Sequence, residues 1–425
     1  MNSLAMQQRA MQATANSTVT NNNPLGVSTL IQQYREQGDA SALENLRQFR
    51  QQLAQFWLNA IDSCLEDVYR SDVSRAYQIM LNSGLRCQPL TSSEQAFVDQ
   101  LLKEFDGELA TPQSLKIFLA LMLYSRTYDL PLKIDLIPVL PWFLEAYLSF
   151  LFESPQMFQI AGEAEQYYQH IKRWVDYLHA HIFANSESPG WQRVAQVFTA
   201  KANFMPLYFS HQNLREINRK RAEIIEFTLT QDGYELDYEF PERAADRHKI
   251  RLGILKNHFN PQTETFLTIP AFEYLDRNQF EIILYTTHGN PHPLEQYCEA
   301  HADRLVYLPH NLKDQVELIR SDDLDILIFG TNVTIQVNDV CQLVAHRLAR
   351  LQATLYSSPV TPALRHVDYY ISGDLTEPPV AAQDHYAEHL ITLQGTGYCF
   401  YYGDEPEPTK SNLTREELGI PANAI

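Results

Sequence analysis

The chain has 425 residues, of which 45% are hydrophobic and 20% are charged, and its formal net charge is -19. This length and composition are typical of a globular protein with two or three domains. The negative charge argues against a broad nucleic-acid surface, which needs clustered lysine and arginine, and against docking on an anionic membrane. The five cysteines form no C-x-x-C pair, which favours scattered reduced thiols over a disulfide framework or a zinc site.

Residues 1–24 are rich in Asn, Gln, Ser and Thr and lack the basic and apolar regions of a signal peptide, so we expect a disordered tail. The most apolar stretch, residues 134–152, is interrupted by Pro138, Pro141 and Glu145 and is too short to span a bilayer. It predicts a buried helix that starts at Pro141. We therefore expect a cytoplasmic protein.

Residues 25–233 predict an all-helical domain. Apolar residues recur at intervals of three or four over 43–61 and 171–182, the period of an amphipathic helix. Ser41 and Thr91 are the expected N-terminal caps of two of these helices. No repeat of about 34 residues is convincing, and this half contains no catalytic motif.

A polar linker at 234–248 separates these helices from a second domain, residues 249–425. Short β-rich runs alternate there with amphipathic runs, which is typical of βαβ units and a parallel sheet. The right-handed crossover rule makes this α/β domain a doubly wound, Rossmann-like sheet. The predicted strands are 249–256, 280–285, 304–308, 325–330 and 353–356, and the predicted helices between them are 265–277, 294–302, 312–320 and 340–350.

Ligands of open parallel sheets bind beyond the carboxyl ends of the strands. Three polar loops, 257–263, 331–334 and 357–361, should therefore converge on one rim, where N–H groups and hydroxyls could hold a phosphate or a sugar. His258 is the leading candidate for proton transfer or hydroxyl contact, and capping of the next helix is an equally good interpretation of it. Ordinary turn and capping roles account for any single polar residue of these loops. The absence of G-x-G-x-x-G and Walker A sequences disfavours a dinucleotide or P-loop site.

Other titratable residues of this domain are weaker candidates. His346 is expected in a helix that faces solvent, and His366 carries no stronger signal. Asp368 is expected to cap its segment or to pair with Arg365. The acidic residues within 322–325 are interpreted as a solvated turn, because other metal ligands are lacking nearby.

An ordered series of motifs in the second domain resembles the SPINDLY-type O-linked N-acetylglucosamine transferases of bacteria. The resemblance covers about residues 250–425. Each motif alone is modest, but their order is fairly specific. The motifs are IRLGILKNHF at 250–259, DILIFGTNVT at 325–334, HRLARLQ at 346–352, DYYIS at 368–372, EPP at 377–379, HYAEHL at 385–390 and TREELGIP at 414–421.

The resemblance implies a GT-B fold, in which two Rossmann-like lobes face each other and helices precede them. It implies transfer of N-acetylglucosamine from UDP-N-acetylglucosamine to serine or threonine of an acceptor protein. The reaction inverts the anomeric centre and needs neither a metal nor another cofactor. The UDP-sugar is then a substrate, and neither nucleic acid nor membrane is a partner.

The resemblance also assigns site residues and shows departures from the family pattern. Gln262 stands where the family has the histidine of a His-Pro pair, so it joins His258 as a catalytic candidate. The loop YSSPVTP at 356–362 lacks the family's glycines, which puts a close backbone approach to the ligand in doubt. The substrate-binding candidates are Asn257, Thr263, Thr334, Pro359 and Thr361.

The sequence stops where the family enters its second, donor-binding lobe, so we expect a fragment or an incomplete transferase that is inactive by itself. Two alternatives stay open. One is a non-catalytic helical interaction protein with a remnant transferase lobe. The other is a different enzyme on a Rossmann-like sheet, such as a sugar-nucleotide epimerase, which the missing glycine-rich loop disfavours.

Overall fold

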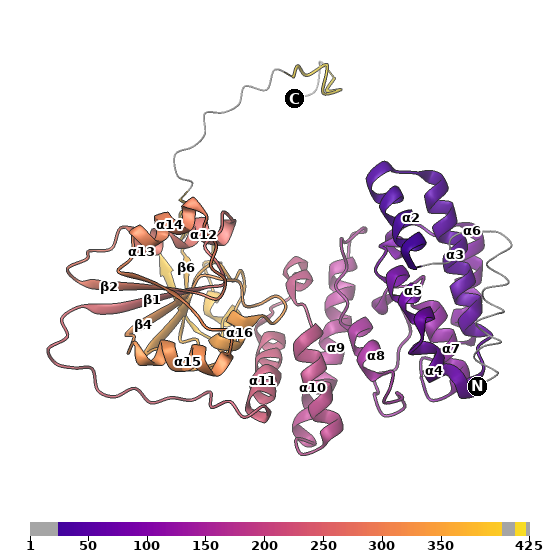
Figure 1. Cartoon of the computed structure of the whole chain (residues 1–425), viewed down its shortest axis with the longest axis horizontal. Helices are drawn as coiled ribbons and strands as arrows, with labels where there is room; N and C mark the ends of the chain where they lie inside the picture. Colours follow the sequence, from indigo (N-terminus) through magenta and orange to yellow (C-terminus); the bar gives the residue numbers. More distant parts are fainter. Residues whose placement is uncertain (1–23, 402–412, 422–425) are drawn as a thin grey trace.

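A computed structural model describes residues 24–401 and 413–421 of the chain. The chain forms an N-terminal array of helices and a C-terminal α/β domain (Figure 1). The predicted tail therefore lies outside the described residues, except Pro24, which begins the first helix. The helical array consists of α2 Pro24–Gln37, α3 Ala40–Leu58, η1 Asp62–Cys64, α4 Leu65–Tyr69, α5 Asp72–Leu81, η2 Leu85–Cys87, α6 Ser92–Glu104, α7 Pro112–Leu121, η3 Thr127–Asp129, α8 Leu144–Leu151, α9 Glu163–Ala184, α10 Pro189–Lys201, η4 Met205–Phe209 and α11 Arg215–Gln231.

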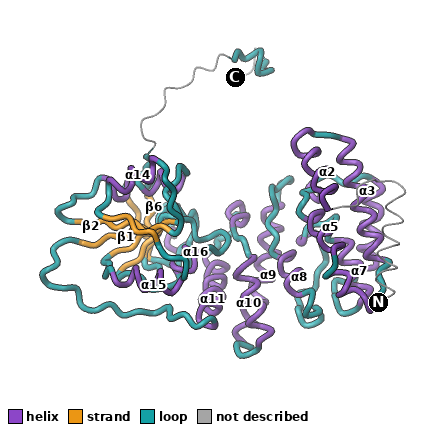
Figure 2. Tube along the Cα trace, viewed as in Figure 1, coloured by secondary structure: helices purple, strands orange, loops and turns teal. Residues whose placement is uncertain are grey.

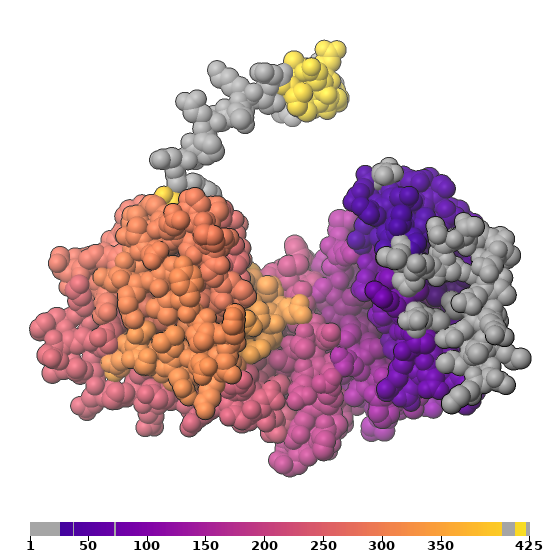
Figure 3. Space-filling view, in the orientation of Figure 1, coloured from indigo at the N-terminus to yellow at the C-terminus, as the bar shows by residue number. Residues whose placement is uncertain are grey.

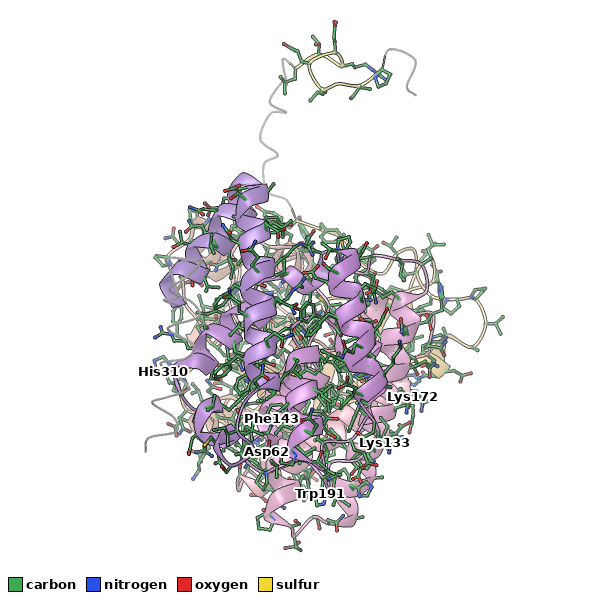
Figure 4. The ribbon with its side chains drawn as sticks, turned by 90° about the vertical axis from the view of Figure 1, so that its right-hand side faces the viewer. Asp62, Lys133, Phe143, Lys172, Trp191 and His310 are labelled. Carbon is green, nitrogen blue, oxygen red and sulfur yellow. The ribbon has the colours of Figure 1, made fainter. Side chains whose placement is uncertain are left out.

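The helices form where the sequence places an apolar stripe. In α3 the buried residues Leu46, Phe49, Leu53 and Trp57 are three or four positions apart and face one interior. Aromatic rings fill much of this core, and Phe143, fully buried, lies among the helices in Figure 4. The prediction of an all-helical first half is confirmed.

The apolar stretch 134–152 is only partly helical. It forms turns up to Phe143, and α8 begins at Leu144. The prediction of a helix start at Pro141 was therefore three residues early, although Leu144 N–H already donates to Leu140 O. No helix within residues 24–401 and 413–421 is both long and apolar enough to cross a membrane.

The structure confirms one of the two predicted N-terminal caps, that of α6, and contradicts the other, that of α3. Thr91 caps α6 in a capping box with Glu94, as expected. Asp39, not Ser41, caps α3 by accepting the N–H of Ser41.

A Thr91→Ala substitution is expected to lower the free energy of unfolding by about 1 kcal/mol, because an N-terminal N–H of α6 loses its acceptor. Urea unfolding measures this loss, and Ser41→Ala is the control, with a change under about 0.5 kcal/mol.

Residues 234–248, the predicted linker, form no helix or strand. The linker is nevertheless fixed to the α/β domain. Leu236 is buried, and its carbonyl accepts the N–H of Arg347 at 2.8 Å. The burial of Leu236 accounts for the alternation of apolar and polar residues before Pro241, although this run pairs with no strand.

The α/β domain contains one seven-stranded sheet in the order β3-β2-β1-β4-β5-β6-β7, and every pair is parallel. Figure 2 shows the strands, in orange, gathered in this domain. The predicted Rossmann-like doubly wound sheet is thereby confirmed, with the change of direction between β1 and β4. The five predicted strands are present, and two more follow them. The strands are β1 Ile250–Lys256, β2 Phe280–Thr286, β3 Arg304–Tyr307, β4 Ile326–Phe329, β5 Leu351–Thr354, β6 Tyr369–Gly373 and β7 His389–Leu393.

Helices cover both faces of this sheet (Figure 1), which is why β1, β2 and β4 are apolar on both sides. A Cβ on Gly253 in β1 would meet Leu324 Cδ1 at 2.7 Å and Leu327 Cδ1 at 2.8 Å, so a larger residue there would force these buried side chains to shift. One face carries α12 Thr263–Thr268, α13 Pro270–Glu273 and α14 Pro293–Ala300, and the other carries α15 Leu312–Ser321 and α16 Asp339–Val344, with η5 Ala382–His385 before β7.

Two predicted helices of this domain are shorter than expected. The run 265–277 is divided into α12 and α13, because Pro270 lacks an N–H and interrupts the hydrogen-bond ladder. The run 340–350 ends as a helix at Val344. His346 consequently leaves the helix and is buried, so its expected solvent-facing position was wrong.

Candidate functional site

The three polar loops that follow β1, β4 and β5 meet at one rim of the sheet, as predicted. The N–H of Asn257 donates to Thr331 Oγ1 at 3.1 Å, and the Thr331 hydroxyl donates back to Asn257 Oδ1 at 3.1 Å. The N–H of Val333 donates to Ser358 Oγ at 3.2 Å. The rim therefore spans the point between β1 and β4 where the strand order reverses, the usual ligand position in such sheets.

His258 lies at this point, directly after β1, and is partly buried. Its N–H donates to Asn257 Oδ1, and its Nδ1 faces the N–H of Asn260 at 3.4 Å, a long and weak contact. Burial and the nearby Lys256 lower the pKa of His258 below its usual value. This shift favours the neutral imidazole, the form that can accept a proton from a hydroxyl.

Lys256, the last residue of β1, is a fully buried lysine that the sequence did not single out as functional. Its Nζ donates to Gly330 O at 2.6 Å, and within the described residues no carboxylate forms a salt bridge with it. Burial lowers the pKa of this amine to about 7, against an attraction from Glu264. A lysine that directly follows the apolar run Leu252–Leu255 was the signal that could have found it.

The loop after β2 joins the same rim, which was not predicted. The Asn290 amide donates to Asn260 Oδ1 at 2.6 Å, so it links the β2 loop to the β1 loop. The N–H of Asn290 in turn donates to both oxygens of Glu295. His288 donates its backbone N–H to Asn257 O at 2.8 Å, which brings a second, exposed histidine beside His258.

Gln262 and Thr263 lie where α12 begins. Gln262 adopts an extended backbone at the N-cap, and its side chain forms no capping hydrogen bond. Thr263 is exposed as the first residue of the helix. Gln262 thus ends the loop that contains His258, and it is half-buried, whereas Thr263 is exposed.

Thr334 and Thr361 are placed at the rim but point inward. The Thr334 hydroxyl is fully buried and bonds to the Tyr208 hydroxyl and to Asn332 Oδ1. The Thr361 hydroxyl donates to Glu388 Oε2 at 2.6 Å, and both residues are buried. These two threonines hold their loops in shape in this structure, whereas Pro359, next to them, is partly exposed.

Three further candidates have structural partners. His346 Nδ1 contacts Gln342 O at 2.8 Å, and burial lowers its pKa to about 4. Burial likewise lowers the pKa of His366 to about 4. Asp368 forms a two-point ion pair with Arg347, at 2.6 and 2.9 Å, so the expected pairing with Arg365 was wrong.

The acidic turn before β4 is not merely solvated, which corrects that prediction. Asp323 and Asp325 pair with Arg247, and Asp322 pairs with Arg304. Arginine side chains thus neutralise this end of the sheet, opposite the rim. Within residues 24–401 and 413–421, no three His, Cys, Asp or Glu side chains are grouped so that they could hold a metal ion.

The helical array and the α/β domain together form a broad concave face (Figure 3). A cavity of about 110 Å³ lies in the helical array, where Arg86 and Arg126 line it beside Glu153. Both arginines are already paired with carboxylates, Arg86 with Glu153 and Arg126 with Asp129 and Glu163. This cavity is thus separate from the rim and has no uncompensated charge from these two side chains.

Known proteins resemble parts of this chain. Over 96 residues, 23% of the chain, it is 33% identical to a probable UDP-N-acetylglucosamine–peptide N-acetylglucosaminyltransferase SPINDLY from rice, Oryza sativa subsp. japonica. The matched segment is 10% of that protein's length, so the chain spans only a small part of this relative. No protein-family model matches the sequence.

A solved O-GlcNAc transferase mutant from Thermobaculum terrenum overlaps 89% of this chain and 59% of its own, at 15% identity. The TM-score of 0.38 is too low to establish a shared arrangement over that length. The sequence similarity to SPINDLY is therefore the stronger of the two findings. A segment of this chain is thus similar in sequence to a probable O-linked N-acetylglucosamine transferase.

Proposed function

We propose that the α/β domain is the acceptor-side lobe of a glycosyltransferase that moves N-acetylglucosamine from UDP-N-acetylglucosamine to serine or threonine hydroxyls of proteins. The observation that carries the proposal is the 33% identity to a SPINDLY transferase over 96 residues. The rim supports it, because a neutral His258 stands beside Asn257 where the strand order reverses. The protein is proposed to act in the cytoplasm.

In the proposed reaction the acceptor hydroxyl oxygen attacks the anomeric carbon of the sugar. The bond from that carbon to the UDP oxygen breaks, UDP leaves, and the configuration inverts. The hydroxyl proton passes to a base or relay, a role for which His258 is the candidate and Gln262 a neighbour that can orient the hydroxyl. Asn257 and Thr263 are the proposed sugar or acceptor contacts, and no metal takes part.

The residues described by the structure contain one Rossmann-like sheet. A UDP-sugar transferred between two lobes also needs a surface for its uridine and diphosphate, and we propose that this surface belongs to a second lobe. The described chain alone is then expected to be inactive.

Calorimetry with UDP-N-acetylglucosamine tests the donor. A form of the protein that carries a second Rossmann-like lobe is expected to bind the donor with a Kd between about 1 μM and 1 mM, the range of ordinary substrate affinities. The chain of 425 residues is expected to bind it far more weakly. GDP-mannose is the control ligand, because its base and sugar both differ. If the two-lobed form released no heat, an interaction protein with a remnant lobe would be the better account.

A further inference from the structure

Three polar side chains of the helical array reach the rim of the α/β domain. They are Tyr208 in η4 and Asn218 and Arg221 in α11, the helix that lies beside the α/β domain in Figure 1. Asn218 and Arg221 are each 1% exposed. All three contact the two loops that leave β4 and β5, here called the β4 loop, residues 330–335, and the β5 loop, residues 357–363.

Arg221 holds the β4 loop by its carbonyls. Its guanidinium donates to Val333 O at 3.2 Å and to Ile335 O at 2.7 Å. Its Nε is buried without an acceptor, and no carboxylate in the described part of the chain forms a salt bridge with it. A buried guanidinium costs free energy unless it forms hydrogen bonds. Two carbonyl groups of the β4 loop supply such hydrogen bonds to Arg221, and these bonds fix the loop to α11.

Tyr208 and Asn218 complete the contact. The Tyr208 hydroxyl bonds to the hydroxyl of Thr334 and accepts the Asn332 amide at 3.3 Å, again in the β4 loop. Asn218 Nδ2 donates to Thr361 O at 2.9 Å in the β5 loop. The helical array therefore supplies a hydrogen-bonding side chain to each of the two loops that flank the proposed site.

Each loop has a second anchor within the α/β domain. Lys256 holds Gly330 O of the β4 loop from β1. Glu388 accepts the N–H of Ala363 at 2.7 Å and the hydroxyl of Thr361 in the β5 loop. Each loop is thus held from two sides, one of which belongs to the helical half.

We propose that Tyr208, Asn218 and Arg221 are positioning residues of the site, so that the helical half fixes the conformation of both rim loops. The inference rests on the proposed function only in taking these loops as the substrate-facing ones. It makes the helical half an integral part of the site rather than a separable module. Because Arg221 and Asn218 hold different loops, their loss has different local consequences.

Hydrogen–deuterium exchange on the full chain tests this inference without any transfer reaction. Arg221→Met is expected to speed exchange about tenfold in the β4 loop, whose Val333 and Thr334 amides are bonded to Ser358 Oγ and Asn332 Oδ1, because one to two hydrogen bonds that close the loop are lost. Asn218→Ala is expected to act likewise on the β5 loop and on the Val333 amide, which is bonded to Ser358 of that loop, and to leave the Thr334 amide, which is bonded within the β4 loop, unchanged. Helices α3 and α9 should not change in either variant.

Matched variants keep this test decisive. Arg215→Met removes an exposed arginine from the start of the same helix and should change neither loop. Arg221→Lys retains the charge and should restore part of the protection. Should Arg221→Met not fold, Tyr208→Phe removes one hydroxyl and is expected to loosen the β4 loop alone. Equal exchange in wild type and in these variants, or loosening spread over the whole chain, would overturn the inference.

Because exchange is measured without donor or acceptor, it succeeds or fails independently of the transferase proposal. In a form of the protein that transfers sugar, Arg221→Met should also lower kcat while leaving the KM for the donor unchanged, because the β4 loop belongs to the acceptor-side lobe. A substitution that only destabilised the fold would lower the amount of active protein. In that case Arg221→Lys would restore no part of kcat.

Discussion

Replacing His258 with alanine is expected to lower the rate of sugar transfer by about 10²- to 10⁴-fold, the usual contribution of a group that moves a proton in the reaction. The residue follows Asn257, whose side chain accepts its backbone N–H, at the point where the strand order reverses. Burial and Lys256 lower the pKa of its imidazole, which favours the neutral form. UDP release from UDP-N-acetylglucosamine, with an acceptor protein present, measures the rate in a form of the protein that turns over.

The pH profile adds a second measurement to the His258 test. A group whose pKa is lowered stays neutral down to a lower pH, so the acid limb of the profile should fall below pH 6.5. His248→Ala is the control, because this exposed histidine precedes the opposite, amino end of β1. Wild-type activity in the His258→Ala protein would remove this residue from the proposed reaction and leave Gln262 as the remaining catalytic candidate.

Replacing Lys256 with methionine is expected to stabilise the protein most at low pH. The folded pKa is lowered to about 7 by burial, whereas lysine in an unfolded chain titrates near 10.5. Between these values the unfolded chain binds a proton that the folded protein does not, so the lysine's contribution to the free energy of unfolding rises with pH. Below pH 7 the folded protein carries the buried charge at its full cost.

The advantage of the Lys256→Met variant over wild type should therefore shrink by roughly 4 kcal/mol between pH 6 and pH 10, a shift of about three pKa units expressed as free energy. The hydrogen bond to Gly330 O, worth about 1 kcal/mol, is lost at every pH and does not alter this difference. Urea unfolding at several pH values measures it. Lys249→Met, at the exposed amino end of β1, should show no such pH dependence, and a constant difference for Lys256→Met would contradict the buried-charge account.

Loss of the Lys256 charge should also be felt by His258. At the pH where His258 titrates, Lys256 is protonated, and its charge is one of the causes that lower the histidine's pKa. In the Lys256→Met protein the pKa of His258 should rise toward its ordinary value. NMR titration of the histidine ring measures the rise, and an unchanged pKa would show that burial alone sets it.

The sequence by itself determined the class of each half. Apolar residues three or four apart determine a helix, and Leu46, Phe49, Leu53 and Trp57 show this in α3. Short apolar runs separated by amphipathic ones indicate parallel strands, and five of the seven strands were predictable in this way, although the edge strand β3 is not buried. The rim followed as well, because carboxyl ends of parallel strands share one edge.

The last two strands escaped prediction because they lack that pattern. In β6 the residues Tyr369, Tyr370 and Ile371 alternate between partly and fully buried positions, and β7 is mostly exposed along its length. Strand β7 forms because it pairs with β6 from Tyr369 to Gly373, a contact between segments about twenty residues apart. The periodicity of apolar residues indicates which positions are buried. It does not indicate which segments pair by backbone hydrogen bonds.

Only the tertiary structure decided which polar side chains of the rim remain available. Thr334 and Thr361 are alike in sequence to Thr263, yet both have hydroxyls bonded inside the protein, to Tyr208 and to Glu388. Their partners come from distant segments, so no local spacing could reveal them. The physical reason is general: a local pattern fixes which face of an element is buried, whereas the hydrogen bond that satisfies a buried polar group depends on whichever distant chain packs against it.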